Sequence, residues 1–264
     1  MENLTPELKK ELFPDNLVLS AYRGSIAHGM YVPNTDPNSI DDVDMMGVYL
    51  APKEYYIGLG NPIDFEKGID HRKSVERFIG KYDVVSYEFR KFVHMLLQSN
   101  PNVLGMLWLK EEHYLSKSLA GQLLIDNRDL FVSNKAYQAF TGYAFDQLKK
   151  MTHINKQGYM GEKRKALVNK YGYDCKNAAH CLRLLTMGFE YLKTGELNVY
   201  REHDAQKFLD VKLGKWTLEQ VQSEAKVLFD LADAAYLYSK LPESPNYTKV
   251  EKLVIEILTS YLYK

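Results

Sequence analysis

The sequence predicts an α+β protein, with a small mixed sheet in the first part of the chain and an α-helical bundle in the second. Short apolar runs bounded by turn residues, which are typical of buried strands, occur before about residue 115. Beyond that point the apolar residues recur almost wholly with helical spacing. The chain has no internal repeat and no linker rich in Gly or Ser. Periodicity alone therefore separates the two parts.

The first part contains three predicted strands and one predicted helix. The run NLVLSAY reads as a buried strand that ends at Gly24, and DDVDMMGVYLAP reads as a strand stopped by Pro52. The third strand is KYDVVSYEF. A helix follows it within EFRKFVHMLLQSNPN, and we expect this helix to end at Asn100 and Pro101.

The second part contains four predicted helices, in NKAYQAFTGYAFDQLKKM, DCKNAAHCLRLLTMGFEYLKTG, TLEQVQSEAKVLFDLADAAYLYSKL and TKVEKLVIEILTSYLY. Two of them begin with apparent capping boxes, Thr217-x-x-Gln220 and Thr248-x-x-Glu251. One ends at Gly195, in the position where glycine commonly terminates a helix.

Charge and cysteine content narrow the function classes. The 34 basic and 34 acidic residues give a net charge of zero, so no global basic field makes nucleic acid the default partner. Cys175 and Cys181 have a spacing that fits neither a zinc knuckle nor a redox pair, and we expect buried thiols in a reducing compartment. Charges throughout the first 16 residues argue against a signal peptide or a membrane span. We therefore expect a cytoplasmic protein with no membrane partner.

Two acidic residues, Asp42 and Asp44, open the second predicted strand. Alternate residues of a strand point to the same face, so both carboxylates are expected to project together. Paired carboxylates suit Mg²⁺, which fills its remaining positions with water and substrate phosphates. By itself, such a pair is also typical of a solvated strand edge or a loop cap.

Gly24 and Ser25 lie where the first strand is expected to turn into a short helix. In that geometry backbone N–H groups and a hydroxyl can face a phosphate. Without further context, a Gly-Ser pair after a strand is usually only a turn.

The combination is more specific than either motif. A strand, Gly24-Ser25, a short helical segment and sixteen residues from Ile26 to Asp41 precede Asp-x-Asp at the head of an apolar strand. This order resembles the nucleotidyltransferase superfamily that includes DNA polymerase beta and the aminoglycoside nucleotidyltransferases. Longer segments, including SIDDVDMMGVYLAP and NKYGYDCKNAAHCLRLL, resemble predicted bacterial and phage nucleotidyltransferases with a helical C-terminal half. The resemblance implies a nucleotidyltransferase domain over 1–114 and a helical domain over 115–264.

The resemblance also implies an activity, which is Mg²⁺-dependent transfer of a nucleoside monophosphate from a nucleoside triphosphate such as ATP to an acceptor hydroxyl, with release of pyrophosphate. Asp42 and Asp44 are then expected to hold two Mg²⁺ ions, for which Mn²⁺ can substitute, and Gly24 and Ser25 to hold the triphosphate. Related sequences tend to read Ser-Asp-x-Asp, whereas here Ile40 and Asp41 stand between Ser39 and Asp42.

The superfamily's third metal-binding acid lies on a later strand. Asp83, which opens DVVSY, occupies that place, and we expect it to serve the metal that activates the acceptor hydroxyl. Glu88 competes with it. If Ser86 caps the following helix, Glu88 falls in its first turn, where the helix dipole favours an acid without any catalytic role.

Basic residues in the helical half offer charge for the nucleotide. Lys176, His180 and Arg183 share one stripe of a helix whose opposite side is apolar. A basic stripe is usually a solvated face. With a triphosphate present, we expect Lys176 and Arg183 to offset the charge of its β- and γ-phosphates.

The roles of several other residues stay open. The cluster Lys163–Lys165, together with Lys170, is either a solvent-facing loop or an acceptor-binding edge. His28 is close enough to the Gly-Ser turn to reach a phosphate, although a histidine there is as often structural. The acceptor is a small hydroxylated molecule, an RNA 3′ end or a protein hydroxyl. The alternative function is a non-catalytic nucleotide-binding or interaction module that retains the fold.

Overall fold

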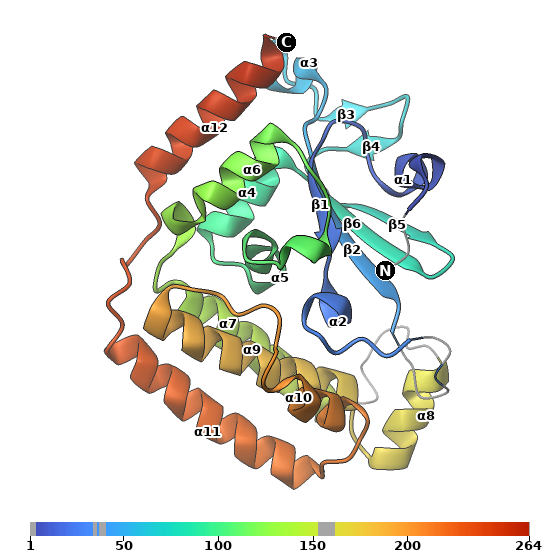
Figure 1. Cartoon of the computed structure of the whole chain (residues 1–264), viewed down its shortest axis with the longest axis vertical. Coiled ribbons are helices and arrows are strands. Elements are labelled where there is room, and N and C mark those ends of the chain that lie inside the picture. Colours follow the sequence, from blue (N-terminus) through green and yellow to red (C-terminus); the bar gives the residue numbers. More distant parts are fainter. Residues whose placement is uncertain (1–3, 34–35, 37–40, 153–161, 264) are drawn as a thin grey trace.

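The computed structural model describes residues 4–33, 36, 41–152 and 162–263. Its first part is built on a five-stranded sheet of β1 (Leu17–Tyr22), β2 (Val43–Tyr49), β5 (Val75–Ile79), β6 (Tyr82–Glu88) and β7 (Tyr114–Lys117). The strand order is β5-β6-β2-β1-β7 (Figure 1). Only β2 and β6 pair in parallel, so the sheet is mixed as the sequence predicts. A small hairpin of β3 (Ile63–Asp64) and β4 (Ile69–Asp70) stands apart from it.

The three predicted strands are the central strands β1, β2 and β6, and the two edge strands were not predicted. Alternate residues of the central strands enter two hydrophobic clusters on opposite faces of the sheet. Met46 and Val85 pack against the helical part, whereas Met45 and Val84 pack toward the first helix, α1 (Pro6–Leu12). Burial on both faces explains why the middle of these strands carries consecutive apolar residues, such as Met45-Met46 and Val84-Val85.

Five further helices accompany the sheet: α2 (Gly24–Ala27), α3 (Lys53–Tyr56), α4 (Phe89–Leu97), α5 (Pro101–Leu104) and α6 (Leu119–Asp126). α4 is the predicted helix, and all of the apolar residues whose spacing predicted it are buried: Phe89, Phe92, Val93, Leu96 and Leu97.

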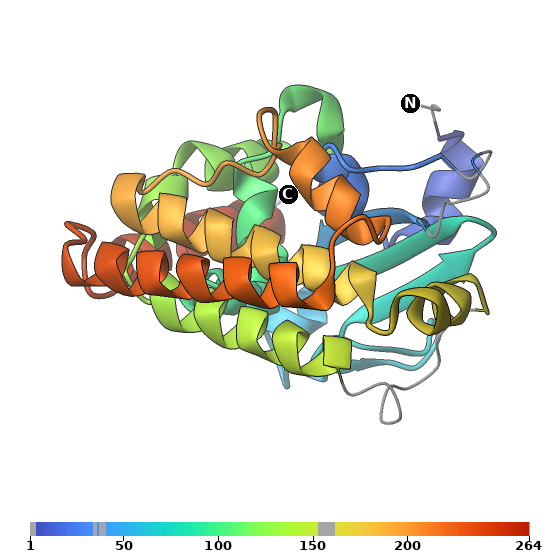
Figure 2. The same cartoon turned by 90° about the horizontal axis from the view of Figure 1, so that it is seen from below.

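The helical half contains α7 (Ala136–Thr152), α8 (Glu162–Tyr171), α9 (Cys175–Thr194), α10 (Ala205–Lys212), α11 (Leu218–Leu237) and α12 (Tyr247–Leu262). The four predicted helices are α7, α9, α11 and α12. α9 packs against α7, α10 and α11, and Figures 1 and 2 show α7, α9 and α11 side by side. Cys175 and Cys181 are buried free thiols on α9, as predicted.

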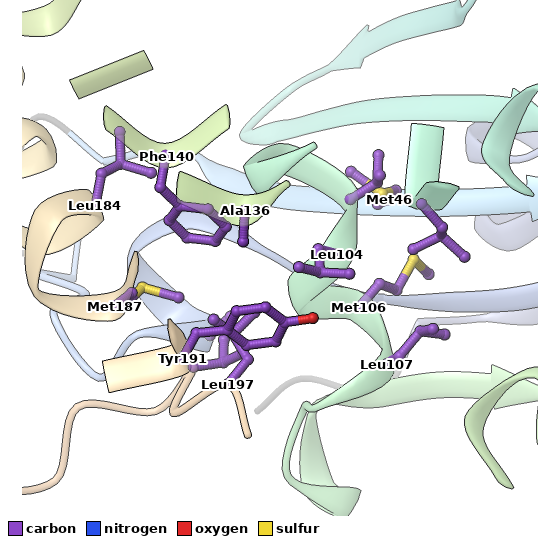
Figure 3. Packing of buried hydrophobic residues seen from close by; sticks show 14 of the residues in the cluster. Met46, Leu104, Met106, Leu107, Ala136, Phe140, Leu184, Met187, Tyr191 and Leu197 are labelled. Atoms are coloured by element: carbon purple, nitrogen blue, oxygen red, sulfur yellow. The ribbon is translucent and has the colours of Figure 1, made fainter. Parts of the chain in front are cut away.

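The contact between α7 and α9 is close. A Cβ atom on Gly188 of α9 would stand 2.8 Å from Cβ of Phe140 on α7, so glycine permits this approach. The Phe140 ring stacks on Tyr191, with the ring centroids 6.4 Å apart. Figure 3 shows Phe140 and Tyr191 packed with Leu184 and Met187. They face Leu104, which belongs to the first part of the chain.

The predicted helix ends are partly confirmed. Thr217 and Gln220 form the capping box of α11, and Gly195 ends α9 with φ of +76°. The prediction for Thr248 and Glu251 is wrong. α12 begins at Tyr247, because the side chain of Asn246 accepts the hydrogen bond from Lys249 N and acts as the cap.

The division predicted after residue 114 stays a prediction, and two features bear on it. β7 crosses that boundary and pairs with β1. One hydrophobic cluster contains sheet residues such as Val48 together with residues of the helical half such as Leu185 and Ile257. Within the described ranges, none of the helices combines the length and apolarity needed to cross a membrane.

Candidate active site

The carboxylates of two neighbouring strands meet at one point of the sheet. Asp44 of β2 and Asp83 of β6 are direct partners in the parallel ladder. Directly paired residues of adjacent strands project to the same face. This is the face that carries Met46 and Val85 and packs against the helical half. The strand register therefore brings together two of the three acids that the sequence singled out.

Arg23, the residue before α2, lies between these two carboxylates. Its Nη2 atom is 3.9 Å from Oδ1 of Asp44 and 4.0 Å from Oδ1 of Asp83. Its backbone N–H donates to the carbonyl of Asp44 at 2.9 Å, which joins the end of β1 to the start of β2. The two acids thus face a position that a cation already approaches.

Burial raises the pKa of Asp44 above its usual range, and the negative charges of Asp83 and Asp42 act in the same direction. The positive charges of Arg23 and Lys176 oppose this shift. A carboxylate in this position gains from an added positive charge, because that charge offsets both the burial and the repulsion.

Gly24 lies directly against the side chain of Asp44. Its φ is +59°, and a Cβ atom here would stand 2.2 Å from Oδ2 of Asp44. Glycine is therefore required on two grounds, the backbone conformation and the space taken by the carboxylate. The next residue, Ser25, has a buried hydroxyl oxygen with no hydrogen-bond partner in the described structure. A buried polar atom without a partner is a natural contact for a ligand.

Asp42 does not lie in a strand, although the alternation argument assumed that it shares one with Asp44. β2 begins at Val43, so Asp42 lies in the preceding loop, where it is exposed. Its charge still acts on Asp44.

In the part of the chain that the structure describes, His, Cys, Asp and Glu side chains nowhere gather in a group of three or more that could hold a metal ion.

Asp41 has a structural partner. It is buried, it accepts a hydrogen bond from Val32 N at 3.0 Å, and it forms an ion pair with Nζ of Lys212. Lys212 belongs to α10 and also approaches the carbonyl of Met30 at 3.3 Å. This pair ties the loop between α2 and β2 to the helical half.

Glu88 is placed away from the other acids. It is the N-cap of α4 and accepts hydrogen bonds from Lys91 N at 3.0 Å and from the Tyr56 hydroxyl at 2.7 Å. Ser86 lies within β6 and does not cap that helix. Glu88 lies five positions after Asp83 on β6, a rise of about 17 Å along a strand. The structure thus puts Asp83, and not Glu88, beside Asp44.

A cavity of about 260 Å³ lies between the sheet and α9. Its lining includes Gly24, Ser25 and Asp44, together with Lys176, His180 and Arg183 of α9. Much of the rest of the lining is apolar: Met30, Met46, Met106, Met187, Leu109, Leu184 and Val199. Gly24, Ser25, Lys176 and Arg183, the residues that the sequence assigns to the nucleotide, therefore share one cavity with Asp44. Their roles stay predictions.

Arg183 corrects one expectation. A basic stripe is usually a solvated face, and the sequence puts Arg183 opposite the apolar side of its helix, but Arg183 is only 8 % exposed. Helical spacing shows which residues share a face and not what covers that face, and α9 is covered on several sides. Burial and the nearby Arg201 lower the pKa of Arg183 to about 9. Its Nη1 lies 3.1 Å from Sδ of Met187, and no described carboxylate forms an ion pair with it. A buried cation of this kind is stabilised by an anionic ligand.

The two histidines of the cavity, His28 and His180, have lowered pKa values. Burial, together with the charge of Arg183, lowers the pKa of both His28 and His180 well below the usual value. Nδ1 of His28 lies 2.9 Å from the carbonyl of Val199, so in the neutral ring it donates there and leaves Nε2 as an acceptor.

The basic cluster on α8 is partly structural. Arg164 pairs with Asp174 at 2.7 Å and donates to Asn177 at 2.9 Å, which joins α8 to the start of α9. Lys165 pairs with Glu162 at 2.9 Å. The side chain of Lys163 lies outside the described part of the structure. Binding of an acceptor by this cluster stays a prediction.

A family model described as the RNA repair pathway DNA polymerase beta family, RlaP, matches residues 3–238. The chain belongs to this family. The resemblance to polymerase beta-like nucleotidyltransferases is thereby confirmed. A relative of the RlaP chain, an uncharacterized protein of Methanocaldococcus jannaschii, is 22% identical over 259 residues, which are 92% of this chain and 94% of that protein.

Among solved structures, the RlaP chain is similar to a nucleotidyltransferase-like protein from Exiguobacterium sibiricum. The alignment has 8% identity and covers 84% of this chain and 69% of the other. Its TM-score of 0.28 is too low to support an argument about the site.

Sequence reasoning missed Arg23 and the contact between Lys212 and Asp41. Arg23 directly precedes the Gly-Ser pair, and that adjacency was a signal that could have found it. The Lys212–Asp41 pair joins residues 171 positions apart, and no local pattern indicates it.

Proposed function

We propose that this protein is a metal-dependent nucleotidyltransferase that transfers a nucleoside monophosphate from a nucleoside triphosphate to an acceptor hydroxyl. The observation that carries the proposal is the register pairing of Asp83 with Asp44, which lines one cavity together with Gly24, Lys176 and Arg183. Membership of the RlaP family supports it.

The residues present fit a divalent cation. Asp44 and Asp83 face a common position that Arg23 approaches at 3.9 and 4.0 Å, and burial raises the pKa of Asp44. Asp44 and Asp83 would hold Mg²⁺ or Mn²⁺, with Asp42 contributing from the adjoining loop. When bound, such ions offset charge on the phosphates and lower the pKa of a coordinated hydroxyl.

The chain's own residues would orient the nucleotide. The N–H groups at the start of α2 and the buried Ser25 hydroxyl would donate to phosphate oxygens, and Lys176 and the buried Arg183 would stabilise the charge on the leaving pyrophosphate. The acceptor oxygen bonds to the α-phosphorus while the bond from that phosphorus to the bridging oxygen breaks. The acceptor's proton passes to solvent, so the products are the modified acceptor and pyrophosphate.

The family description supports one of the three candidate classes of acceptor. Because the description of the RlaP family names an RNA repair pathway, we propose an RNA 3′ hydroxyl as the acceptor. A net charge of zero does not oppose this, since the end of a strand requires only a small basic surface.

Incubation with each of the four nucleoside triphosphates labelled at the α-phosphate, with Mg²⁺ and a 3′-hydroxyl RNA, tests the proposal. We expect the label to enter the RNA with at least one nucleotide and the pyrophosphate to be released, and both to be lost in Asp44→Asn. Nucleotide binding without transfer to any RNA, protein or small hydroxylated acceptor would instead favour a non-catalytic nucleotide-binding module.

A further inference from the structure

Phe78 of β5 is a large apolar side chain that is 67% exposed. It is the direct partner of Asp83 in the antiparallel pair of β5 and β6, and Asp83 is the direct partner of Asp44. The three residues therefore form one row across the sheet with their side chains on the same face. Adjacent strands lie about 4.8 Å apart, so Phe78 is one strand beyond Asp83 and two beyond Asp44.

The two faces of β5 have different surroundings, and Phe78 lies on the exposed face. Val75, Arg77 and Ile79 are partly buried, and Arg77 donates to carbonyls at the end of α1. Glu76 and Phe78, which point the other way, are exposed. A single exposed apolar residue is common on any protein. The feature that singles out Phe78 is its register with the acid assigned to the acceptor.

The expected direction of the reaction places the acceptor on this side. In nucleotidyl transfer, the attacking oxygen and the leaving pyrophosphate lie roughly in line on opposite sides of the α-phosphorus. Gly24 and Ser25 follow β1, so the leaving phosphates are assigned to the β1 side of Asp44. The attacking hydroxyl then approaches from the β6 and β5 side, where Asp83 is 43% exposed and the next residue across is Phe78.

We infer that Phe78 is the surface on which the terminal base of an RNA acceptor stacks. Aromatic side chains stack on the unpaired bases of single-stranded RNA, and this contact tolerates any base. A terminal nucleotide held in this way presents its ribose hydroxyl toward Asp83. The inference rests on the proposed function and deepens it by assigning the acceptor to one face of the sheet.

The charge nearby is compatible with an RNA strand. Lys81 lies in the turn between β5 and β6, with Nζ 5.5 Å from the Tyr82 ring. α8, which contains Lys165 and Lys170, lies on the same side of the molecule as this turn (Figure 1). Basic side chains in these positions can follow the phosphates leading to the stacked end.

A short RNA with 2-aminopurine as its terminal base tests the inference without requiring transfer. Stacking on an aromatic ring quenches this fluorophore, so we expect quenching by the unaltered protein, loss of quenching with Phe78→Ala and recovery with Phe78→Trp. Because Phe78 is exposed, neither variant should alter folding. Phe65→Ala, which removes an aromatic side chain that is 79% exposed in the β3–β4 turn, is the matched control and should quench normally.

Transfer kinetics give the second readout. In Phe78→Ala the KM for RNA should rise about 5- to 100-fold while nucleotide affinity is unchanged, since stacking contributes that much per base. An RNA whose terminal nucleotide lacks its base should show the same loss with the unaltered protein and no further loss with Phe78→Ala.

The inference is overturned if the RNA end does not bind, if quenching persists in Phe78→Ala, or if the abasic end is used as well as the normal one. Transfer to a protein or to a small molecule in place of RNA also overturns it. Quenching that depends on Phe78, in the absence of any transfer, would leave the inference standing while the proposed function fails.

Discussion

Asp44 and Asp83 are direct neighbours in the parallel pair of β2 and β6, and the guanidinium of Arg23 lies within 4.0 Å of both carboxylates. The chain reaches this arrangement from three separate segments. Burial raises the pKa of Asp44, and repulsion from Asp83 adds to the shift, whereas the charges of Arg23 and Lys176 oppose it. The pKa of Asp44 is raised despite these two cations, and this makes the pair informative about function.

Asp83→Asn and Glu88→Gln separate a catalytic acid from a structural one. Asp83→Asn should abolish transfer and largely spare nucleotide binding, because the side chain is partly exposed and is proposed to serve the acceptor. Glu88→Gln should lower the free energy of unfolding by about 1–2 kcal/mol, since it weakens the cap of α4 and the contact with Tyr56, and should retain transfer. Urea unfolding and label transfer measure the two effects. Loss of transfer in a folded Glu88→Gln protein would reassign the third acid.

Gly24→Ala should disable the site. The left-handed φ costs about 1–2 kcal/mol for alanine, and the new Cβ atom displaces the Asp44 carboxylate. Gly68→Ala is the matched control, because Gly68 has φ of +64° and open space around a Cβ atom. Gly24→Ala should lose at least as much stability in urea unfolding as Gly68→Ala, since it adds the collision with Asp44, but only Gly24→Ala should lose transfer. Full transfer by Gly24→Ala would show that the position of Asp44 is not critical.

Lys212→Met should destabilise the fold by about 3–5 kcal/mol, because it leaves the buried carboxylate of Asp41 without its cation. The double variant Asp41→Asn with Lys212→Met should regain part of that loss, since no buried charge then remains uncompensated. The measurement is a double-mutant cycle by urea unfolding. Additive effects of the two single variants would contradict the assignment of this pair as a buried link between the loop and α10.

His180 should make the fold sensitive to acid. Its pKa is lowered in the folded state by burial and by Arg183, so below about pH 6.5 the unfolded chain binds a proton that the folded chain does not. Stability is therefore full above that pH and falls as the pH drops, by up to about 1.4 kcal/mol per pH unit. The loss of Tm between pH 7 and pH 5 should be smaller in His180→Gln than in the unaltered protein. Exposed His203→Gln is the control, and an equal loss in all three proteins would contradict the prediction.

The sequence allowed the centre of the fold to be predicted and not its edges. β2 and β6 are apolar on both faces because both faces are buried, and α4 and α9 have strong helical periodicity. Edge strand β5 alternates partly buried with exposed residues, and β7 is four residues of mixed polarity, so neither resembles a buried strand.

The proximity of some candidate site residues could be predicted from the sequence, although their roles stay predictions. Gly24, Ser25 and Asp44 were chosen from the motif order that resembles nucleotidyltransferases, and Asp83 from the place of that superfamily's third acid; the structure pairs Asp83 with Asp44 and puts Gly24 against Asp44. The burial of Arg183 depends on what packs around α9, and the contact of Lys212 with Asp41 depends on the tertiary fold. Neither property is encoded by spacing along one helix.

The most direct test of the central claim is the stability of the protein with a non-hydrolysable nucleoside triphosphate and Mg²⁺, because this measurement does not require the acceptor. The account predicts that nucleotide and metal together raise the free energy of unfolding by about 2.7 kcal/mol at a hundredfold excess over Kd. The gain should be much smaller without metal and in Asp44→Asn. The account is contradicted if none of the four nucleotides stabilises the protein with Mg²⁺ or Mn²⁺, or if Asp44→Asn gains as much as the unaltered chain.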